Sequence, residues 1–337
     1  MNKSPINQDS TRSRGKDLLV IFILIIVFSL ILEQTIRLYI FGKVSFSYHK
    51  MKSIGSMGYT GYLKKSDIPD VIYEFKPGID SYFKLVEFKT NSHGLRDKEY
   101  SLEKPTNTFR VAVIGGSYTV PAGVEVDQAF HSILENRLNQ EYPDLSYEFI
   151  NFGVSGYKIN NKIATLKYKA LEYKPDLILF ILDGSQFAEV EESEKEFNPK
   201  PKRNQFFHSF TYELISKIKL LKNDRKHQEF LNDHLGKLDE FDLALQEISQ
   251  ISKNYIVPIC IVVLDHDYSH YELSTKIKSL VENNNLYYSN TIPAFKDTNL
   301  GDLTIDKIDI HPNAKANQMF ADAIYNDLKK QSLLKNQ

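Results

Sequence analysis

The chain has very little cysteine and very little net charge, and each shortage excludes a class of protein. Its single cysteine, Cys260, excludes an intramolecular disulfide and a cluster of thiolate metal ligands. Because Cys260 lies inside the apolar run IVPICIVVL, we expect a buried and unreactive thiol. The formal net charge of -1 gives no indication of binding to nucleic acid or to an acidic ligand.

Apolar residues are abundant enough for a large folded domain. The 337 residues are 42% hydrophobic and 12% aromatic. This content can fill a sizeable core, so we expect one large domain or two small ones.

The amino terminus has the pattern of a membrane anchor. Residues 1–16 are polar and mainly basic, whereas residues 18–32 are apolar apart from Ser29. Continuing the segment to residue 41 supplies the ~20 residues that a membrane-spanning helix needs. Glu33 and Arg37 fall on one helical face near its end, where we expect them to pair.

We therefore predict a cytoplasmic tail over 1–16 and a transmembrane signal anchor over 17–41. Large residues stand where a cleavage site would need small ones, which favours an uncleaved anchor over a removed signal peptide. Basic flanks stay on the cytoplasmic side, so the chain from about residue 44 onward is expected to lie across the membrane. The predicted protein is single-pass, with its main domain on the periplasmic or extracytoplasmic side, and the membrane segment could contact a membrane-protein partner.

Residues 44–107 lack a helical period and are interpreted as a membrane-proximal extension. Alternation of side chains between residues 82 and 88 predicts a strand or two beside the main domain. No residue of this segment is an obvious catalytic candidate.

From residue 108 the pattern changes to apolar strands that alternate with amphipathic helices. The strands lack polar alternation, which is typical of a parallel sheet buried on both faces. We predict an α/β domain over 108–331 with a parallel sheet of about five strands and right-handed crossovers. The strands are expected at 111–114, 147–154, 175–182, 256–264 and 286–290, and the first helix is expected to be capped by Asp127.

Residues 186–236 interrupt this alternation with charged and Pro-Lys-rich stretches. We interpret them as an insertion over the carboxyl edge of the sheet. Insertions at that edge usually shape the access of substrate to the site.

A serine stands where the first strand of the domain ends. Gly115 and Gly116 allow a sharp turn that would present Ser117 at the carboxyl end of the strand, where open α/β sheets bind ligands. Ser117 is therefore a candidate nucleophile. The alternative is a plain strand-to-helix turn in which Ser117 only caps the next element.

A histidine precedes the last predicted helix. His311 is followed by Pro312, a residue preferred at the first helical position. Near neutral pH an imidazole is well suited to take the proton of a serine hydroxyl, provided that a second group orients it. Asp309 is the first candidate for this orienting group and Asp306 is the reserve. The alternative is a helix-capping histidine without a catalytic role.

A third motif, NFGVSG, comes directly after the second predicted strand. Acyl transfer develops an oxyanion, which fixed donors such as backbone N–H groups stabilise. Gly153 can bring its N–H close to a bound carbonyl, and Asn151 can bridge neighbouring loops. The alternative is a turn that merely ends the strand.

The blocks GGSYT, NFGVSG and DIHPN occur in the order typical of the SGNH, or GDSL-like, hydrolase family, which the chain resembles over residues 108–331. The basic tail, the anchor and NSHGLRD resemble the membrane-anchored bacterial branch of that family. The resemblance implies a flavodoxin-like three-layer α/β/α sandwich, no metal, no cofactor, and ester hydrolysis or acyl transfer. It also implies Ser117 as nucleophile, His311 as base, Asp309 as its orienting group, and Ser117 and Gly153 as oxyanion donors.

Two positions depart from the family pattern. Gly116 stands where the nucleophile block often has aspartate, which should affect the geometry of the turn more than the chemistry. The asparagine of the third block is absent from residues 182–186, where Ser185 or Gln186 could donate a hydrogen bond instead. Loss of one oxyanion donor typically costs ~100- to 1000-fold in turnover.

The sequence therefore predicts a membrane-anchored serine esterase or O-acyltransferase that acts on acyl esters of glycans or lipids, with acetyl esters as one option. The alternative is a catalytically impaired SGNH-fold protein that binds a glycan or a membrane partner. Acidic and histidine residues at 265–270 could suggest a metal site, but no further ligand cluster stands at a defined spacing, so we interpret them as loop residues lining the cleft.

Overall fold

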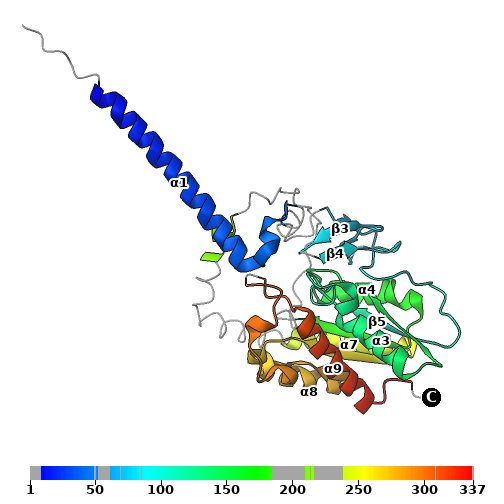
Figure 1. Ribbon diagram of the computed structural model, residues 1–337. Helices are drawn as coiled ribbons and strands as arrows, with labels where there is room; N and C mark the ends of the chain where they lie inside the picture. The colour runs from blue at the N-terminus through cyan, green and yellow to red at the C-terminus, as the bar shows by residue number, and fades with distance from the viewer. Residues whose placement is uncertain are drawn as a thin grey trace, which may run out of the picture.

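The computed structural model describes residues 9–48, 51, 61–183, 209–215 and 238–335, apart from residues 69, 85, 213 and 308. Within these ranges a long amino-terminal helix leads into two small antiparallel hairpins and then into an α/β body (Figure 1). The predicted insertion over 186–236 lies outside the described residues, apart from part of the stretch 209–215.

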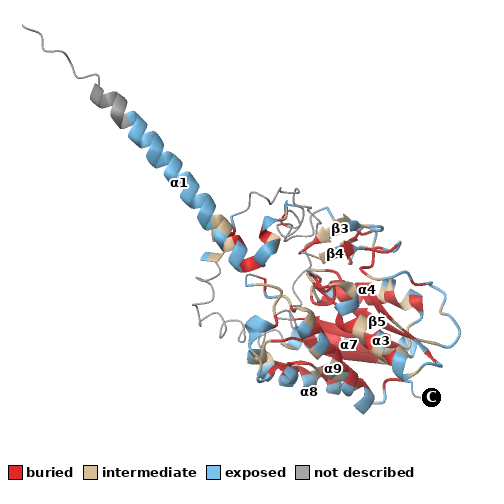
Figure 2. Ribbon diagram, in the orientation of Figure 1, coloured by how far each residue is buried: buried red, intermediate tan, exposed pale blue. Residues whose placement is uncertain are grey.

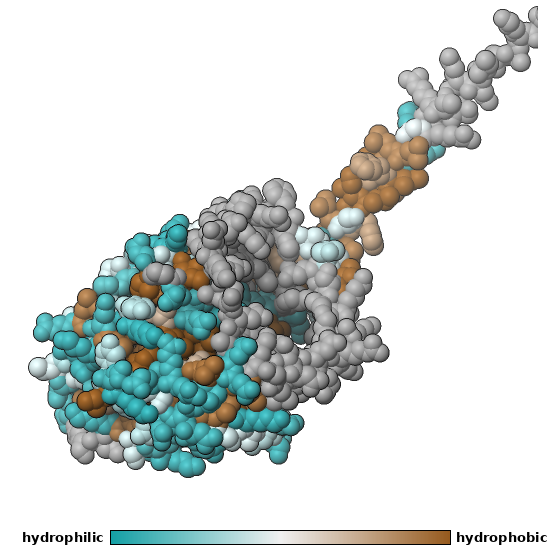
Figure 3. Space-filling model, turned by 180° about the vertical axis from the view of Figure 1, so that it is seen from behind, coloured by the Kyte–Doolittle hydropathy of each residue, from teal (hydrophilic) through white to brown (hydrophobic). Residues whose placement is uncertain are grey.

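Helix α1 (Asp9–Phe41) extends away from the body (Figure 1). The stretch Gly15–Phe46 is long and apolar enough to cross a membrane, and its most apolar part is not buried against the rest of the chain. Figure 2 shows this part of α1 as exposed, and Figure 3 shows that hydrophobic residues cover its surface. A surface of this kind would be covered in a lipid bilayer.

The carboxyl end of α1 is attached to the rest of the chain by a carboxylate. Glu33 Oε1 accepts from Arg37 Nε at 2.9 Å, as the spacing predicted. Glu33 also accepts from the backbone N–H groups of Phe210 (2.9 Å) and Thr211 (3.1 Å). A small apolar cluster supports this contact and consists of Ile40, Phe41, Met51 and Phe210. A described part of the 209–215 stretch is thus docked on the carboxyl end of α1.

The extension forms two hairpins, β1 (Leu63–Lys65) with β2 (Tyr73–Phe75) and β3 (Asp80–Phe83) with β4 (Val86–Lys89). The strands expected between residues 82 and 88 are therefore present. The hairpins pack on the body through one shared cluster of buried side chains. Its members include Val71, Phe75, Phe83 and Phe88 from the extension and Val120, Ala122, Val154 and Tyr157 from the loops after β5 and β6. The extension therefore covers the loops that carry two of the three sequence motifs.

The body contains a five-stranded parallel sheet in the order β6-β5-β7-β8-β9. This order is that of flavodoxin-like folds, and it confirms the predicted α/β class. The strands are β5 (Thr108–Ile114), β6 (Ser146–Asn151), β7 (Leu177–Asp183), β8 (Ile259–Leu264) and β9 (Tyr287–Asn290). Every residue of β7 and β8 is buried, as continuous apolar runs predict. Figure 2 shows the sheet around β5 coloured as buried.

Helices cover both faces of the sheet and make three layers (Figure 1). Alternate residues of β5 point to opposite faces: Ala112 and Ile114 to one cluster, Val111 and Val113 to the other. The first face is covered by α4 (Ile159–Tyr168), α7 (Leu238–Tyr255) and α8 (Tyr271–Asn283), and the second by α3 (Phe130–Glu141) and α9 (Ala314–Lys330). Short 3-10 helices are η1 (Gly42–Phe46), η2 (Val126–Gln128), η3 (Ala170–Tyr173), η6 (Tyr268–His270), η7 (Ile292–Phe295) and η8 (Leu300–Asp302).

Two helix starts differ from the prediction. Asp127 lies inside η2, and Ala129 occupies the cap position of α3 without a side-chain hydrogen bond. Helix α9 begins at Ala314, because the Asn313 side chain accepts from Ala316 N at 3.1 Å and caps it. Pro312 therefore stands outside the helix, where it forms an isolated bridge with Thr304.

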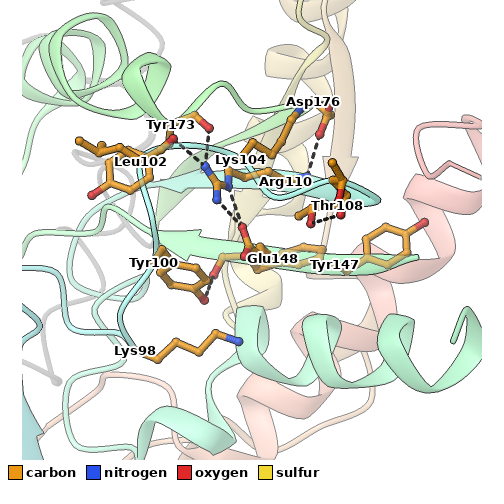
Figure 4. Close-up of polar contacts among 12 residues, drawn as sticks. Lys98, Tyr100, Leu102, Lys104, Thr108, Arg110, Tyr147, Glu148, Tyr173 and Asp176 are labelled. Carbon is orange, nitrogen blue, oxygen red and sulfur yellow. Dashed lines mark hydrogen bonds and ion pairs between the residues drawn. The ribbon is translucent and has the colours of Figure 1, made fainter. Parts of the chain in front are cut away.

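The amino edge of the sheet is tied together by Arg110 at the start of β5 (Figure 4). Its side chain is 0% exposed, and its Nε donates to Glu148 Oε2 at 2.7 Å. Its Nη1 donates to the carbonyl oxygens of Tyr173 (2.7 Å) and Leu102 (3.2 Å). Asp176 Oδ2 accepts the Arg110 N–H at 2.8 Å. This network joins β5, β6 and the loop before β7 at the end opposite to Ser117.

Candidate active site

Ser117 lies in the turn directly after β5, at the carboxyl edge of the sheet. A Cβ atom added to Gly116 would lie 2.5 Å from Asp183 Oδ2, so any side chain there would collide with the neighbouring strand. The sharp turn therefore requires glycine by close approach. Ser117 is half-buried, and its hydroxyl has no hydrogen-bond partner among the described residues.

A buried ion pair between Lys162 and Asp183 lies beside this turn. Asp183 ends β7, and its Oδ1 pairs with Lys162 Nζ at 2.6 Å while each side chain is 2% exposed. Asp183 Oδ2 accepts the Tyr118 N–H at 3.2 Å. A carboxylate from the adjacent strand therefore occupies the space beside Gly116.

The histidine block forms an Asp-His pair. Asp309 Oδ1 lies 2.6 Å from His311 Nδ1 and also accepts the His311 N–H at 3.1 Å. Asp306, the reserve candidate, instead accepts the Asp309 N–H through Oδ1 at 2.8 Å. Burial raises the pKa of the Asp309 carboxyl, but its hydrogen bond with His311 and the charge of Lys84 outweigh burial and hold that pKa far below its usual range. Asp309 is therefore an ionised carboxylate in contact with the imidazole.

The imidazole of His311 lies beside the nucleophile turn. Its ring centroid is 5.6 Å from that of Tyr118, the residue after Ser117, in an edge-to-face arrangement. Tyr118 also contacts the His266 ring at 5.5 Å. Residues from the ends of β5 and β8 and from the loop before α9 therefore meet at one edge of the sheet, as parallel topology predicts.

The middle motif uses Asn151 as an internal link. Asn151 is buried, its Nδ2 donates to Thr119 O at 2.8 Å, and its Oδ1 accepts the Gly153 N–H at 2.8 Å. Asn151 therefore does bridge the loops after β5 and β6. The Gly153 N–H that was expected to face an oxyanion is engaged by this side chain. Gly156, exposed and with φ at +85°, has no backbone N–H partner among the described residues.

The remaining candidate donors, Ser185 and Gln186, lie outside the described residues. In the acidic loop after β8, Asp265 Oδ2 lies 2.6 Å from His270 Nδ1, and Asp265 Oδ1 accepts the Asp267 N–H at 3.0 Å. Across the described part of the chain, no group of three or more His, Cys, Asp or Glu side chains could hold a metal ion.

One residue at this edge comes from a segment in which the sequence suggested no catalytic candidate. Lys84, in the turn between β3 and β4, forms a buried ion pair with Asp309 Oδ2, and its Nζ lies 3.4 Å from His311 Nδ1. The only signal in the sequence was a lysine within a largely aromatic and aliphatic stretch. Nothing local indicated that this lysine would reach a motif near the other end of the chain.

No protein-family model and no curated protein matches the chain. Solved structures with a similar fold include Axe2, an acetylxylan esterase from Geobacillus stearothermophilus, with 15% identity and a TM-score of 0.43 over 65% of this chain and 94% of that chain. LAE5, an alpha/beta hydrolase from the metagenome of Lake Arreo, Spain, has 14% identity and a TM-score of 0.43 over 68% and 97%. CEX, a two-domain esterase active on acetylated mannans, has 12% identity and a TM-score of 0.42 over 68% and 52%. This likeness is too distant to carry residue roles or a substrate.

Proposed function

We propose that the protein is a membrane-anchored serine esterase or O-acyltransferase that acts on acyl esters, acetyl esters among them, of glycans or lipids. The observation that carries the proposal is the 2.6 Å contact between Asp309 Oδ1 and His311 Nδ1 beside the turn of Ser117. An imidazole whose Nδ1–H is held by a carboxylate has Nε2 free to accept a proton, which is what a serine nucleophile needs.

In the proposed reaction Ser117 Oγ attacks the acyl carbonyl carbon while His311 Nε2 takes the hydroxyl proton. The tetrahedral intermediate collapses when His311 returns that proton to the leaving alkoxide, which leaves an acyl-serine. Water or a sugar hydroxyl then attacks the acyl-serine while His311 takes its proton. The bond between the acyl carbon and Ser117 Oγ breaks, His311 gives the proton to Ser117 Oγ, and the carboxylic acid or the new sugar ester leaves. The acceptor, water or sugar, decides between esterase and transferase.

For the oxyanion we propose the Ser117 N–H together with an N–H from the turn after β6. Gly153 stays a candidate only if Asn151 Oδ1 releases its N–H on substrate binding, because the two groups are now 2.8 Å apart. Gly156 offers an exposed N–H in the same turn. Ser185 or Gln186 would add the donor that the third block otherwise lacks.

The location of the site is part of the proposal. With α1 as an uncleaved anchor and its basic end cytoplasmic, the α/β body lies on the periplasmic or extracytoplasmic side. Glycans and lipids exposed on that side are then within reach of the anchored domain, and a membrane-protein partner could deliver an acyl group.

Labelling of the full chain in detergent with a fluorophosphonate probe tests the proposal. We expect the wild type to be labelled and Ser117→Ala to lose the label, while Ser155→Ala, a change in the turn after β6, retains it. Hydrolysis of a short aryl acetate should fall by ~10⁴-fold or more in Ser117→Ala and His311→Ala. A folded wild type without label, or a label that survives Ser117→Ala, would favour the catalytically impaired binding protein instead.

A further inference from the structure

The β3–β4 hairpin brings a buried cation to the Asp-His pair. Lys84 pairs with Asp309 Oδ2, and the side chains of Lys84 and Asp309 are 8% and 7% exposed. Asp309 Oδ1, the other oxygen, is the one that contacts His311 Nδ1. Each oxygen of this carboxylate therefore has its own partner, which leaves the carboxylate a single favourable orientation.

The backbone at Lys84 is held in an unfavourable conformation. Its φ is +48°, in the left-handed region, where the Cβ of a residue other than glycine crowds the backbone. A turn of this kind persists only where its surroundings hold it, and such residues concentrate at functional sites. Here Phe83 and Phe88 on either side of the turn are fully buried in the cluster shared with the loop after β5.

A second contact fixes the hairpin to the nucleophile loop. Arg96, from the NSHGLRD stretch, is 1% exposed. It donates to Glu87 O of β4 at 3.0 Å, and to Val120 O (2.6 Å) and Val124 O (2.8 Å) of the loop after Ser117. The hairpin that carries Lys84 and the loop that carries Ser117 are therefore joined through one guanidinium group.

We propose that Lys84 is a positioning residue of the active site, which holds the Asp309 carboxylate so that Oδ1 binds His311 Nδ1–H and Nε2 is left for the Ser117 proton. The membrane-proximal extension is then part of the catalytic unit. This inference rests on the proposed function for its kinetic consequence, but its structural consequence at His311 does not depend on activity.

The charge of Lys84 also opposes the imidazolium form of His311, because two cations 3.4 Å apart repel each other. The other groups around the ring are Asp309 itself, Tyr118 and, across Tyr118, His266. Burial lowers the pKa of His266, so this neighbour is a neutral ring near pH 7. Removing Lys84 should therefore make His311 easier to protonate.

The test compares Lys84→Met with Lys89→Met in the full chain in detergent. Lys89 lies in the same hairpin, is 54% exposed and pairs with Glu87 at 3.0 Å. For Lys84→Met we expect kcat to fall ~10- to 100-fold, the magnitude typical of partners that orient a catalytic group, with KM within about twofold. The acid limb of the pH–rate profile of Lys84→Met should move to higher pH. Lys89→Met should match the wild type in kcat, in KM and in the pH–rate profile.

A readout without turnover separates this inference from the proposed function. The titration of His311 is followed by NMR with 13Cε1-labelled histidine and assigned with His311→Gln. An upward shift in Lys84→Met but not in Lys89→Met supports the role of Lys84 even if the wild type hydrolyses no ester. Lys84→Gln keeps a donor to Asp309 without the charge, and it should show the same shift if Lys84→Met does not fold. An unchanged titration in the folded variant overturns the inference.

Discussion

The two edges of the sheet both bury cations, but they use them differently. At the amino edge the donors of Arg110 go to two backbone carbonyls and to Glu148 (Figure 4). At the carboxyl edge Lys162 and Lys84 each pair with one aspartate, and these aspartates contact Tyr118 N and His311. The first arrangement joins strands and loops. The second places charge beside the proposed nucleophile and base, so changes at the two edges should have different consequences.

The largest effect is expected at the amino edge. Arg110→Met leaves the Glu148 carboxylate and two carbonyl groups without their partner, and breaking a buried ion pair in this way costs about 3–5 kcal/mol of unfolding free energy. Urea unfolding measures this loss. Turnover per folded molecule should stay unchanged, because none of these groups contacts the site.

The matched control is Arg137→Met. Arg137 pairs with Asp322 at 3.0 Å on the surface, where the two side chains are 41% and 51% exposed. An exposed pair contributes up to about 1 kcal/mol. Equal losses in the two variants would mean that the buried network at the amino edge contributes no more than a surface contact.

At the carboxyl edge Gly116→Ala should affect both stability and activity. The new Cβ would lie 2.5 Å from Asp183 Oδ2, and overpacking of this kind costs about 1–3 kcal/mol. If Asp183 moves away, the Tyr118 N–H loses its acceptor and the turn of Ser117 shifts, so turnover per folded molecule should fall as well.

Gly301→Ala is the comparison for that variant. A Cβ at Gly301 would meet Asn299 Oδ1 at an ordinary 3.5 Å, so little change is expected in urea unfolding or in turnover. If Gly116→Ala behaved like Gly301→Ala in both measurements, the close approach of Asp183 would not constrain the nucleophile turn.

Much of this architecture could be predicted from local patterns. Continuous apolar runs predicted the strands β7 and β8. The parallel arrangement of the strands predicted that the Ser117 and His311 motifs would lie at one edge of the sheet, where the Tyr118 and His311 rings are in contact. The spacing of Glu33 and Arg37 predicted their ion pair. In each case the signal lay within a few residues or came from a general rule of topology.

The features that could not be predicted depend on contacts between distant segments. Lys84 reaches Asp309 because one residue of a hairpin turn takes a left-handed conformation, which a lysine does not signal. The pairing of β5 with β7 brings the Asp183 side chain against Gly116, and the residues around Gly116 give no sign of this contact. The start of α9 was misplaced because Pro312 and Asn313 are both good helix starters, and the Asn313 side chain forms the cap.

The smallest effect expected concerns a buried carboxylate without a buried cation. Glu148 has Arg110, whereas Asp97 Oδ2 accepts the Asn151 N–H at 2.9 Å and Asp97 Oδ1 accepts the Lys98 N–H at 2.8 Å. Burial raises the pKa of Asp97 to about 7, although these hydrogen bonds lower it. The carboxyl group of Asp97 thus contacts the end of β6 and changes its protonation state near neutral pH.

The stability of the wild type should therefore fall as pH rises through this range. An unfolded aspartate titrates near pH ~3.9, so between about pH 4 and 7 the folded chain holds a proton that the unfolded chain has lost. Asp97→Asn cannot ionise and keeps an oxygen acceptor, so between pH 6 and pH 8 it should gain about 1 kcal/mol relative to the wild type in urea unfolding. Asp322→Asn, on the surface, should behave like the wild type across the same range. A constant difference between Asp97→Asn and the wild type would mean that Asp97 is already ionised at pH 6, and that burial does not raise its pKa to the neutral range.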